Sequence, residues 1–495
     1  MASYVLTIDQ GTTGSTVLLF NRAMDLVGKG YQEFRQIYPT PGWVEHDLED
    51  IWASVLAALK QALCSAGVQG SDIAAIGITN QRETVGLWER GTGKPLGNAI
   101  VWQDRRTAGR CAELKACEGK NVEGMVRQRT GLLLDPYFSG TKIEWMLRNN
   151  PEMDRKARSG EAAAGTIDTF LAWRLSGGRV HVTDVSNASR TLLFNINTLA
   201  WDKTMLSLFD VPESILPEVR SCCEVYGHTH GLGLLPDGIP IAGIAGDQQA
   251  ALFGQCCFDQ GEGKCTYGTG AFMLVNTGAT PVASRNRLLT TVAWQIDGVT
   301  TYALEGSSFI AGAAVQWLRD GLKMIRSADE IEALAREVES SDGVVVVPAF
   351  VGLGAPHWRA DARAVILGIT RGTTRAHIAR ATLEGIALQI HDLAEAMQQD
   401  MGMSIAELKV DGGAAVNNLL MQYQCDILNT TVVRPRIVET TALGAAALAG
   451  LAVGFWGGLD DVRQSWQVDT IFRPTMDEKC RQAHLDRWKS AVAKA

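Results

Sequence analysis

The sequence predicts an α/β protein built from two duplicated halves, and three observations support this fold class. Short apolar runs rich in β-branched residues alternate with longer helical patterns, as they do in α/β proteins. The chain has 495 residues, which is too long for one ordinary core. A strand–turn–strand unit with a Gly- and Thr-rich turn occurs near residue 10 and again near residue 268. We therefore expect two domains, residues 1–252 and 253–495, around a central cleft, with chance recurrence of a hairpin as the alternative.

The first half begins with this unit. Strands are predicted at Tyr4–Ile8 and Val17–Phe20, and the turn between them is Gln-Gly-Thr-Thr-Gly-Ser. Spaced apolar residues predict a helix at Leu48–Ser65. Two further apolar runs of strand length follow at Ile73–Thr79 and Ile239–Ile244.

The second half repeats the unit, with strands at Cys265–Tyr267 and Phe272–Val275 around the turn Gly-Thr-Gly. The charged stretch Leu322–Ser341 indicates an exposed helix without chemistry. The apolar segment Thr441–Trp456 contains three glycines and is short for a membrane span, so a buried helix is expected. The remaining elements are predicted as strands at Val344–Val347 and Leu408–Val410 and as helices at Ala311–Leu322, Ala376–Met401 and Val416–Leu428.

Composition and charge exclude several classes of function. The formal net charge is −8 and no long run of Lys or Arg occurs, so we expect no nucleic-acid partner. Asp9 interrupts the first apolar stretch, so we expect no secretory signal. None of the ten cysteines forms a CxxC pair, and reduced thiols in the cytoplasm are the simplest interpretation.

The first candidate site is the turn that follows Tyr4–Ile8. Its glycines let backbone N–H groups approach an anion, and the hydroxyls of Thr12, Thr13 and Ser15 can donate further hydrogen bonds to phosphate. A carboxylate beside phosphate requires a cation between them, so Asp9 is a candidate Mg²⁺ ligand. An ordinary hairpin turn that uses Asp as a turn residue is the alternative.

The second candidate is Asp247, which follows the predicted strand Ile239–Ile244. The carboxyl end of a buried strand is where α/β folds place reacting groups, and Asp247 could accept a proton from a hydroxyl that attacks phosphorus. Asp is also a common residue at the start of a helix, here Gln248–Phe253. The two interpretations are compatible.

Two segments of the second half have a similar character. Thr269 lies in the repeated Gly-Thr-Gly turn. Gly413 lies where Leu408–Val410 ends, so its backbone could lie against a flat ring to which Asn417 could hydrogen-bond. A turn or helix cap is the alternative for this segment.

Several known site patterns are missing from the sequence. It contains no GxxxxGK followed by Ser or Thr, no GxGxxG after a strand and no GxSxG nucleophile elbow. His228 and His230 have no third ligand near them, so a surface loop is favoured over a metal site.

Taken in order, these segments resemble the family of sugar and polyol kinases (FGGY) that has the actin-like ATPase fold. The resemblance covers essentially the whole chain and implies two duplicated actin-like (ribonuclease H-like) ATPase domains, with ATP and Mg²⁺ bound in the cleft between them. It implies phosphoryl transfer to a small polyol in the cytoplasm by a homodimer or homotetramer. The segments that carry it start at Asp9, Tyr137, Gly246, Tyr267, Gly352 and Asp411.

The segment Thr79–Thr84 is similar to that of family members that phosphorylate glycerol. Glycerol has three hydroxyls and a small apolar edge, so a site for it requires donors, acceptors and a flat apolar cover. Arg82 can donate and Glu83 can accept. The resemblance implies that the triol is surrounded by Arg82, Glu83, Trp102, Tyr137, Asp247, Gln248 and Phe272.

For the nucleotide, the resemblance implies Thr12, Thr13 and Thr269 around the phosphates. It implies Mg²⁺ held by Asp9 and Asp247, with Asp247 also as the general base. Gly312 and Gln316 are four residues apart and would share a helix face, for which packing is the alternative role. The residues implied at the adenosine side are Gly312, Gln316, Gly413 and Asn417.

The sequence departs from the family pattern in two places. Many relatives carry Arg where this chain has Thr16, which leaves open how phosphate charge is met there. The loop at 231–237 lacks the Gly/Arg-rich character that binds fructose 1,6-bisphosphate in some members, so we do not expect that regulation. The alternatives are a kinase for another polyol or a pentulose, a nucleotide-switched interaction protein, and an inactive paralogue.

Overall fold

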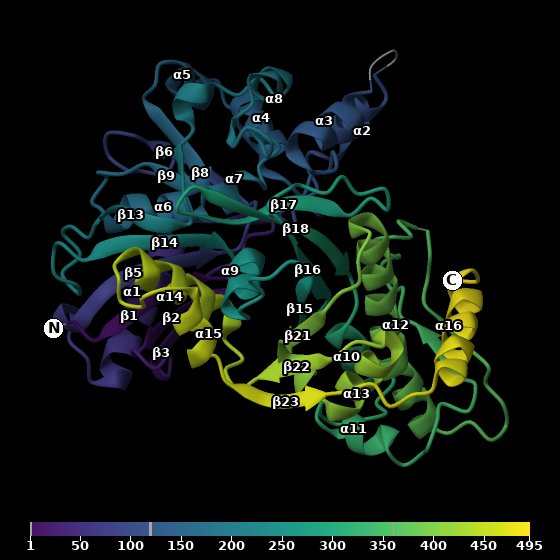
Figure 1. Cartoon of the computed structure of the whole chain (residues 1–495). Helices are drawn as coiled ribbons and strands as arrows, with labels where there is room; N and C mark the ends of the chain where they lie inside the picture. The colour runs from purple at the N-terminus through teal and green to yellow at the C-terminus, as the bar shows by residue number, and fades with distance from the viewer. Residues whose placement is uncertain (1, 118–120, 360) are drawn as a thin grey trace.

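The computed structural model describes residues 2–117, 121–359 and 361–495. It has two lobes that lie side by side, each built on one large sheet (Figure 1). The first lobe contains the N-terminal sheet and an extension above it, and the second lobe contains the C-terminal sheet and the helices around it.

The first large sheet has six strands, and its three central neighbours β14, β5 and β1 run parallel. β2 and β3 continue the sheet on one side as antiparallel hairpins, and β13 is the antiparallel edge on the other side. In sheet order the strands are β13 (Cys223–His228), β14 (Pro240–Gly246), β5 (Ile73–Asn80), β1 (Tyr4–Gln10), β2 (Gly14–Phe20) and β3 (Leu26–Glu33).

The second large sheet repeats this topology. β18, β16 and β15 are antiparallel neighbours like β3, β2 and β1, and β21 and β22 run parallel to β15 as β5 and β14 run to β1. In sheet order the strands are β17 (Leu289–Ile296), β18 (Val299–Ser308), β16 (Ala271–Gly278), β15 (Glu262–Tyr267), β21 (Glu407–Asp411), β22 (Val432–Pro435) and β23 (Val468–Phe472). The predicted duplication is therefore confirmed by strand order and direction.

Helix α1 (Leu48–Ala66) covers one face of the first sheet, and α14 (Thr440–Ala452) covers the other. The chain that forms α14 comes from near the C-terminus, and the yellow helix lies against the purple strands in Figure 1. Its alanines and glycines allow a very close approach: a Cβ at Gly444 would overlap the carbonyl oxygen of Ala250, and one at Gly77 would overlap that of Ala445. The two halves of the chain are thus joined by a helix that crosses between them.

An extension, formed mainly by the chain that connects β5 to β14, lies at the top of the first lobe. It contains the four-stranded sheet β4 (Glu45–His46), β7 (Ala99–Ile100), β6 (Val85–Glu89) and β8 (Ala162–Thr166). Its helices are α2 (Ala108–Lys115), α3 (Val122–Thr130), α4 (Ser139–Asn149), α5 (Pro151–Arg158), α6 (Ile167–Leu175), α7 (Val185–Ala188) and α8 (Lys203–Leu208). Short strand pairs complete it: β10 (Phe194–Asn195) with β11 (Ala200–Trp201), and β9 (Val182–Asp184) with β12 (Glu218–Arg220).

In the second lobe, the long helix α12 packs against β16 and β18. The helices of this lobe are α10 (Gly312–Asp320), α11 (Glu330–Ala335), α12 (Arg375–Met401), α13 (Asn418–Leu428) and α16 (Glu478–Val492). Two more helices, α9 (Asp247–Gly254) and α15 (Leu459–Ser465), belong instead to the core that includes residues of β1, β2 and α14. A small pair of strands, β19 (Val345–Val347) and β20 (Val365–Leu367), lies beside α12.

The predicted elements are found within a few residues of their expected bounds, with one exception. The stretch Leu322–Ser341 forms only the short helix α11, and the prediction of a fully exposed helix is wrong because Ile331, Leu334 and Ala335 are buried in the second core. The expected boundary after residue 252 falls inside α9. Within the residues that the structure describes, no helix is long and apolar enough to cross a membrane.

Candidate active site

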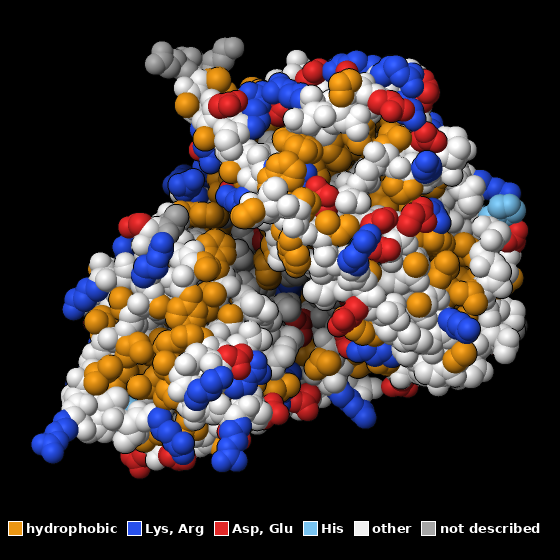
Figure 2. Space-filling view, turned by 180° about the vertical axis from the view of Figure 1, so that it is seen from behind, with side chains coloured by type: hydrophobic (Ala, Val, Ile, Leu, Met, Phe, Trp, Pro, Cys, Tyr) orange, Lys and Arg blue, Asp and Glu red, His pale blue; other side chains and the backbone are white. Residues whose placement is uncertain are grey.

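The carboxyl ends of β1, β5 and β14 meet at one edge of the first sheet. Asp9 and Ala245 both align with Thr79 across the parallel ladders. This register brings Asp9, the turn after β5 and the residues after β14 to the same edge, which faces the second lobe. The molecular surface is hollowed where the two lobes meet (Figure 2).

Asp247 follows β14 directly and is the first residue of α9. Its side chain is 33% exposed, and its Oδ1 accepts a hydrogen bond from the backbone N–H of Gln248 at 2.7 Å. The same oxygen lies 3.0 Å from Nε of Arg82. Asp247 therefore occupies a helix N-terminus and also faces the junction of the lobes, so both interpretations of its position are compatible with the structure.

Arg82 lies in the turn after β5 and is almost fully buried, with 2% of its side chain exposed. Its Nη1 and Nη2 donate to the two carboxylate oxygens of Glu305 at 2.5 and 3.0 Å. Nη1 also donates to Oε1 of Gln249 at 3.2 Å. One guanidinium group thus joins the carboxylate of Asp247 to a carboxylate on the second lobe.

Glu83 is next to Arg82 and has a positive φ of 63°, a conformation that non-Gly residues adopt rarely. Its Oε1 accepts a hydrogen bond from Nε of Arg190 at 2.7 Å, whereas no hydrogen bond within the described residues reaches its Oε2. Burial raises the pKa of Glu83, although Arg82 and Arg190 oppose that rise. The unused oxygen is an acceptor with capacity for a ligand.

Two aromatic rings lie beside this cluster. The rings of Trp102 and Tyr137 meet edge to face at 5.5 Å, and Nε1 of Trp102 donates to Oγ1 of Thr12 at 2.9 Å. Burial, followed by the charge of Glu83, raises the pKa of Tyr137, so its hydroxyl stays protonated. Phe272 extends from β16 opposite Ser307 of β18, which places it on the same face of the second sheet as Glu305.

Asp9 is half-buried at the end of β1. Burial and the negative charges of Asp247 and Glu439 raise its pKa to about 7. Asp9 and Asp247 lie next to a turn suited to phosphate, and this donor set suits Mg²⁺, which binds one or two carboxylates together with phosphate oxygens. Among the described residues no group of three or more His, Cys, Asp or Glu could hold a metal by itself.

The three hydroxyl side chains predicted to bind phosphate in the turn between β1 and β2 do not all lie on the same side. Thr13 is exposed at the tip and Thr12 is half-buried beside Trp102. Ser15, however, is fully buried, and its hydroxyl is 2.8 Å from that of Ser54 on α1. Ser15 therefore points away from the other two hydroxyls, and the structure does not bring it to the junction of the lobes. Thr16 pairs directly with Asp9 across the hairpin.

Near the corresponding turn of the second half, two glycines lie so close to backbone carbonyl groups that a side chain would not fit. Gly312, at the start of α10, donates to the carbonyl of Gly268 at 2.9 Å, and a Cβ there would lie 2.7 Å from that oxygen. Gly412 has a φ of 88°, and a Cβ added at this position would lie 2.6 Å from the carbonyl oxygen of Tyr267. Thr269 and Gly413 are exposed beside these contacts.

Gln316 is exposed one turn along α10 from Gly312. Asn417 is buried and caps α13, because its side-chain oxygen accepts a hydrogen bond from the N–H of Leu420 at 2.9 Å. Its amide nitrogen is not used by this cap. The structure thus gathers Thr269, Gly312, Gly413 and Asn417 around the ends of β15 and β21.

Sequence reasoning missed four residues of the cluster: Arg190, Gln249, Lys264 and Glu305. Nζ of Lys264 is hydrogen-bonded to Oε1 of Gln248 and, at 2.9 Å, to Oγ1 of Thr266. Burial lowers the pKa of Lys264. The available signal was a single charged residue inside an apolar strand, as in Glu305 of Tyr-Ala-Leu-Glu-Gly and Lys264 of Gly-Lys-Cys.

The repeated hydroxyl-bearing turns and the charged junction between two duplicated sheets define a sugar-kinase type of phosphotransferase. The chain belongs to the FGGY family of carbohydrate kinases: the N-terminal domain of the family matches residues 4–254 and the C-terminal domain matches residues 263–453. This confirms the predicted family and its two-domain actin-like ATPase fold.

Similar proteins within the family are glycerol kinases. The glycerol kinase of Myxococcus xanthus is 59% identical over 496 residues, which cover 100% of this chain and 99% of that protein. That of Deinococcus radiodurans is 58% identical, with 99% of this chain and 97% of that protein covered. The crystal structure of Plasmodium falciparum glycerol kinase with ADP has a TM-score of 0.94 at 40% identity and covers 99% of this chain and 98% of that one.

Proposed function

We infer that this protein transfers the γ-phosphoryl group of ATP to glycerol and forms sn-glycerol 3-phosphate. Relatives named glycerol kinase match the chain from end to end at 58–59% identity, and a solved glycerol kinase with ADP has the same fold. The observation that carries the proposal is the buried group of donors and acceptors around Arg82, which has unused hydrogen-bonding capacity. A polyol is the kind of ligand that such a group binds.

Glycerol would bind against the turn after β5. Arg82 donates to one hydroxyl, and the free oxygen of Glu83 accepts from another. Tyr137 and Gln248 offer further polar contacts, and the rings of Trp102 and Phe272 cover the CH₂ edge. An analogue that lacks a hydroxyl leaves buried polar atoms without partners, which costs more than a missing methylene group.

Asp247 would act as the general base. It accepts the proton of the attacking hydroxyl while the new O–P bond forms and the bond between phosphorus and the ADP oxygen breaks. Arg82 and the N–H of Gln248 orient its Oδ1, so that the second oxygen is free to take the proton. The proton is then released to water when the product leaves.

The nucleotide would lie across the ends of β1 and β15. We assign the phosphates to Thr12, Thr13 and Thr269, and the adenosine side to Gly312, Gln316, Gly413 and Asn417. Mg²⁺, which would be held by Asp9 and Asp247, neutralises the charge that develops on the phosphate oxygens when it is bound. Closure of the lobes would exclude water from the phosphoryl group.

A substrate panel tests this function. The purified chain is assayed for ADP release with ATP, MgCl₂ and either glycerol, erythritol or xylulose, and the product is identified by ³¹P NMR. We expect glycerol to be the preferred substrate. A pentulose or another polyol as the better substrate would contradict the assignment, and so would ATP hydrolysis that no polyol affects, which is the signature of a nucleotide-switched interaction protein.

We further propose that the enzyme acts in the cytoplasm as a homodimer or homotetramer, in line with the predicted family resemblance. Light scattering during size-exclusion chromatography measures the mass of the particle directly. A mass equal to one chain of 53.4 kDa at all concentrations would contradict the oligomer.

A further inference from the structure

We propose that Glu305 and Arg190 are positioning residues, which hold Arg82 and Glu83 from opposite lobes in the orientation that selects for a third hydroxyl on the polyol. This inference rests on the proposed function, because it concerns the same polyol site. Neither residue was predicted from the sequence, and neither needs to touch the substrate for this role.

Glu305 fixes the plane of the Arg82 guanidinium. Its carboxylate accepts both Nη groups of Arg82, at 2.5 and 3.0 Å, in a bidentate pair. Such a pair fixes direction as well as distance, because the fork of the guanidinium matches the carboxylate. With its Nη groups held in this way, Arg82 turns its Nε toward Asp247 at 3.0 Å.

Arg190 connects the same carboxylate to Glu83. Its Nη2 donates to Oε1 of Glu305 at 2.9 Å, and its Nε donates to Oε1 of Glu83 at 2.7 Å. The guanidinium also lies 5.4 Å from the ring centre of Phe138. Because Arg190 occupies Oε1 of Glu83, it leaves Oε2 as the oxygen available to a ligand.

The charge cluster is a costly way to fill this space, which argues against a role in stability alone. All of these side chains except Asp247 are at most 3% exposed. Nη1 of Arg190 is buried and has no hydrogen-bond partner among the described residues. Buried ion pairs often contribute less to stability than apolar residues of the same size, and an unpaired buried donor adds a further cost.

The two glutamates differ in how they are held. Two guanidinium groups lower the pKa of Glu305 to about 2 against the effect of burial. Burial instead raises the pKa of Glu83. Glu305 is therefore a saturated anchor with three charge-assisted hydrogen bonds, whereas Glu83 retains an unsatisfied acceptor.

The anchor belongs to the second lobe, and the residues that it orients belong to the first. Glu305 lies in β18, and the hydroxyl of Tyr302 in the same strand donates to the carbonyl of Ile196 at 2.7 Å. The hydroxyl of Thr291 in β17 is 2.9 Å from that of Ser189. The polyol-binding pair is thus assembled only where β17 and β18 dock onto the first lobe.

The experiment compares glycerol with propane-1,2-diol, which lacks one terminal hydroxyl, in Glu305→Gln. We expect kcat/KM for glycerol to fall about 100-fold and kcat/KM for the diol to fall about tenfold or less, because the diol uses fewer of the oriented groups. The ratio of the two values therefore shrinks, while KM for ATP stays within about twofold of wild type. A variant that only reduces the folded fraction lowers both substrates equally and would overturn the proposal.

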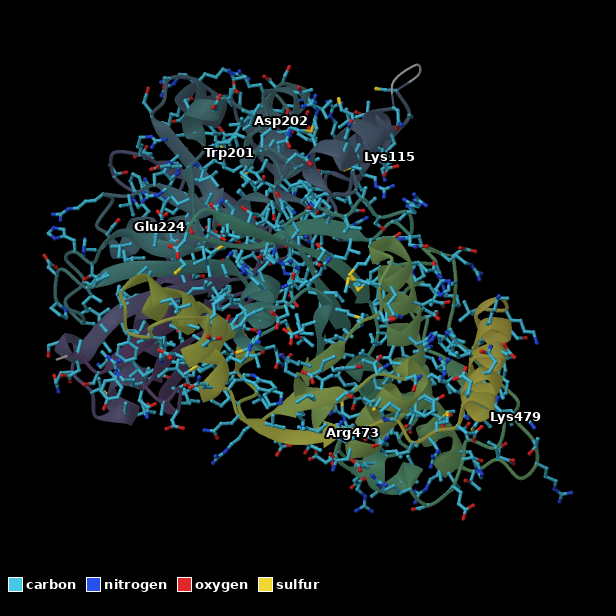
Figure 3. The ribbon with its side chains drawn as sticks, viewed as in Figure 1. Lys115, Trp201, Asp202, Glu224, Arg473 and Lys479 are labelled. Carbon is cyan, nitrogen blue, oxygen red and sulfur yellow. The ribbon has the colours of Figure 1, made fainter. Side chains whose placement is uncertain are left out.

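Asp202→Asn is the matched control, because it also converts a buried, ion-paired carboxylate into an amide. Asp202 is 5% exposed, its Oδ2 lies 2.8 Å from Nη1 of Arg129, and it is in the outer part of the first lobe beside α8 (Figure 3). We expect it to lower stability and to leave the ratio of glycerol to diol unchanged. If Asp202→Asn changes the glycerol-to-diol ratio as much as Glu305→Gln does, the proposal is also overturned.

Arg190→Lys and Glu305→Asp keep the charges and serve if Glu305→Gln does not fold. Lysine has no planar fork, so it can hold one of the two carboxylates but not both, and the glycerol-to-diol ratio should again fall. A wild-type ratio in these folded variants contradicts the positioning role. If the wild-type protein phosphorylates no polyol, the proposed function itself fails, which is a distinct result.

Discussion

Asp247→Asn tests the chemical step most directly. Asparagine has the shape of aspartate, and its carbonyl oxygen can still accept the N–H of Gln248, but it cannot take up a proton. Arg82 retains its two hydrogen bonds to Glu305. We therefore expect the fold to persist, with a loss of stability of about 1–2 kcal/mol for one hydrogen bond to a charged group.

The expected loss of activity is much larger than the loss of stability. A positioned general base contributes about 10²–10⁴-fold to the rate, so kcat should fall about 10³-fold, which corresponds to about 4 kcal/mol in activation free energy. The affinity for ADP should change little, because the residues that we assign to the adenosine side lie around the ends of β15 and β21 in the second lobe.

The assay measures ADP release with saturating glycerol and MgATP, together with ADP binding by calorimetry. Asp202→Asn is again the control, since its carboxylate is ion-paired with Arg129 and lies away from the junction of the lobes. A kcat within about tenfold of wild type in Asp247→Asn would refute its role as a base. A parallel loss of ADP binding would instead indicate damage to the whole site.

Three further substitutions test the packing at Gly444, the buried carboxyl group of Asp168 and the hydrogen bond of Trp102. Gly444→Ala should destabilise the protein by about 3 kcal/mol in urea, because its Cβ overlaps the carbonyl oxygen of Ala250. Burial, followed by the charge of Asp184, raises the pKa of Asp168 to about 7. The stabilising contribution of the protonated side chain is therefore present at acidic pH and is lost as the pH rises through 7. The free energy of unfolding of the wild type should fall between pH 5 and 8, and Asp168→Asn should remove on the order of 3 kcal/mol of this fall. Trp102→Phe, which removes the hydrogen bond to the hydroxyl of Thr12, should lower kcat/KM for glycerol about fivefold, or about 1 kcal/mol. Trp201→Phe, which removes an indole hydrogen bond to the carbonyl of Pro217, should not lower it.

Each of these expectations has a clear contrary result. Wild-type stability in Gly444→Ala would mean that α14 can shift away from α9. Unfolding curves of Asp168→Asn and wild type that change in parallel between pH 5 and 8 would show that this carboxyl group is not the source of the decline. Equal kinetic losses in Trp102→Phe and Trp201→Phe would show that the loss does not come from the contact between Trp102 and Thr12.

Much of the fold could be predicted because its signals are local. The strands, the two Gly- and Thr-rich turns and the long helices each depend on residues close together in sequence. The position of Asp247 at the end of a buried strand and the start of a helix was predicted in the same way. The failure at Leu322–Ser341 is also local: charged residues concealed a short apolar face at Ile331 and Leu334.

The rest of the site depends on contacts that sequence spacing does not reveal. Glu305 meets Arg82 and Arg190 across more than 100 residues of chain, and their partnership follows from how β18 docks onto the first lobe. Ser15 illustrates a different limit. It lies only three residues from Thr12, but side chains alternate along β2, and this one faces Ser54 on α1.

The placement of α14 has a consequence for how the protein is made. A ribosome that has completed β14 has yet to synthesise about 200 residues before the segment that covers the inner face of the first sheet emerges. Until then the face of the sheet at Gly77 and Gly243, which lie close against the backbone of that helix, has no cover. Nascent chains of this protein should therefore bind general chaperones until α14 has emerged, and an isolated N-terminal half should be insoluble unless a peptide with the α14 sequence is supplied.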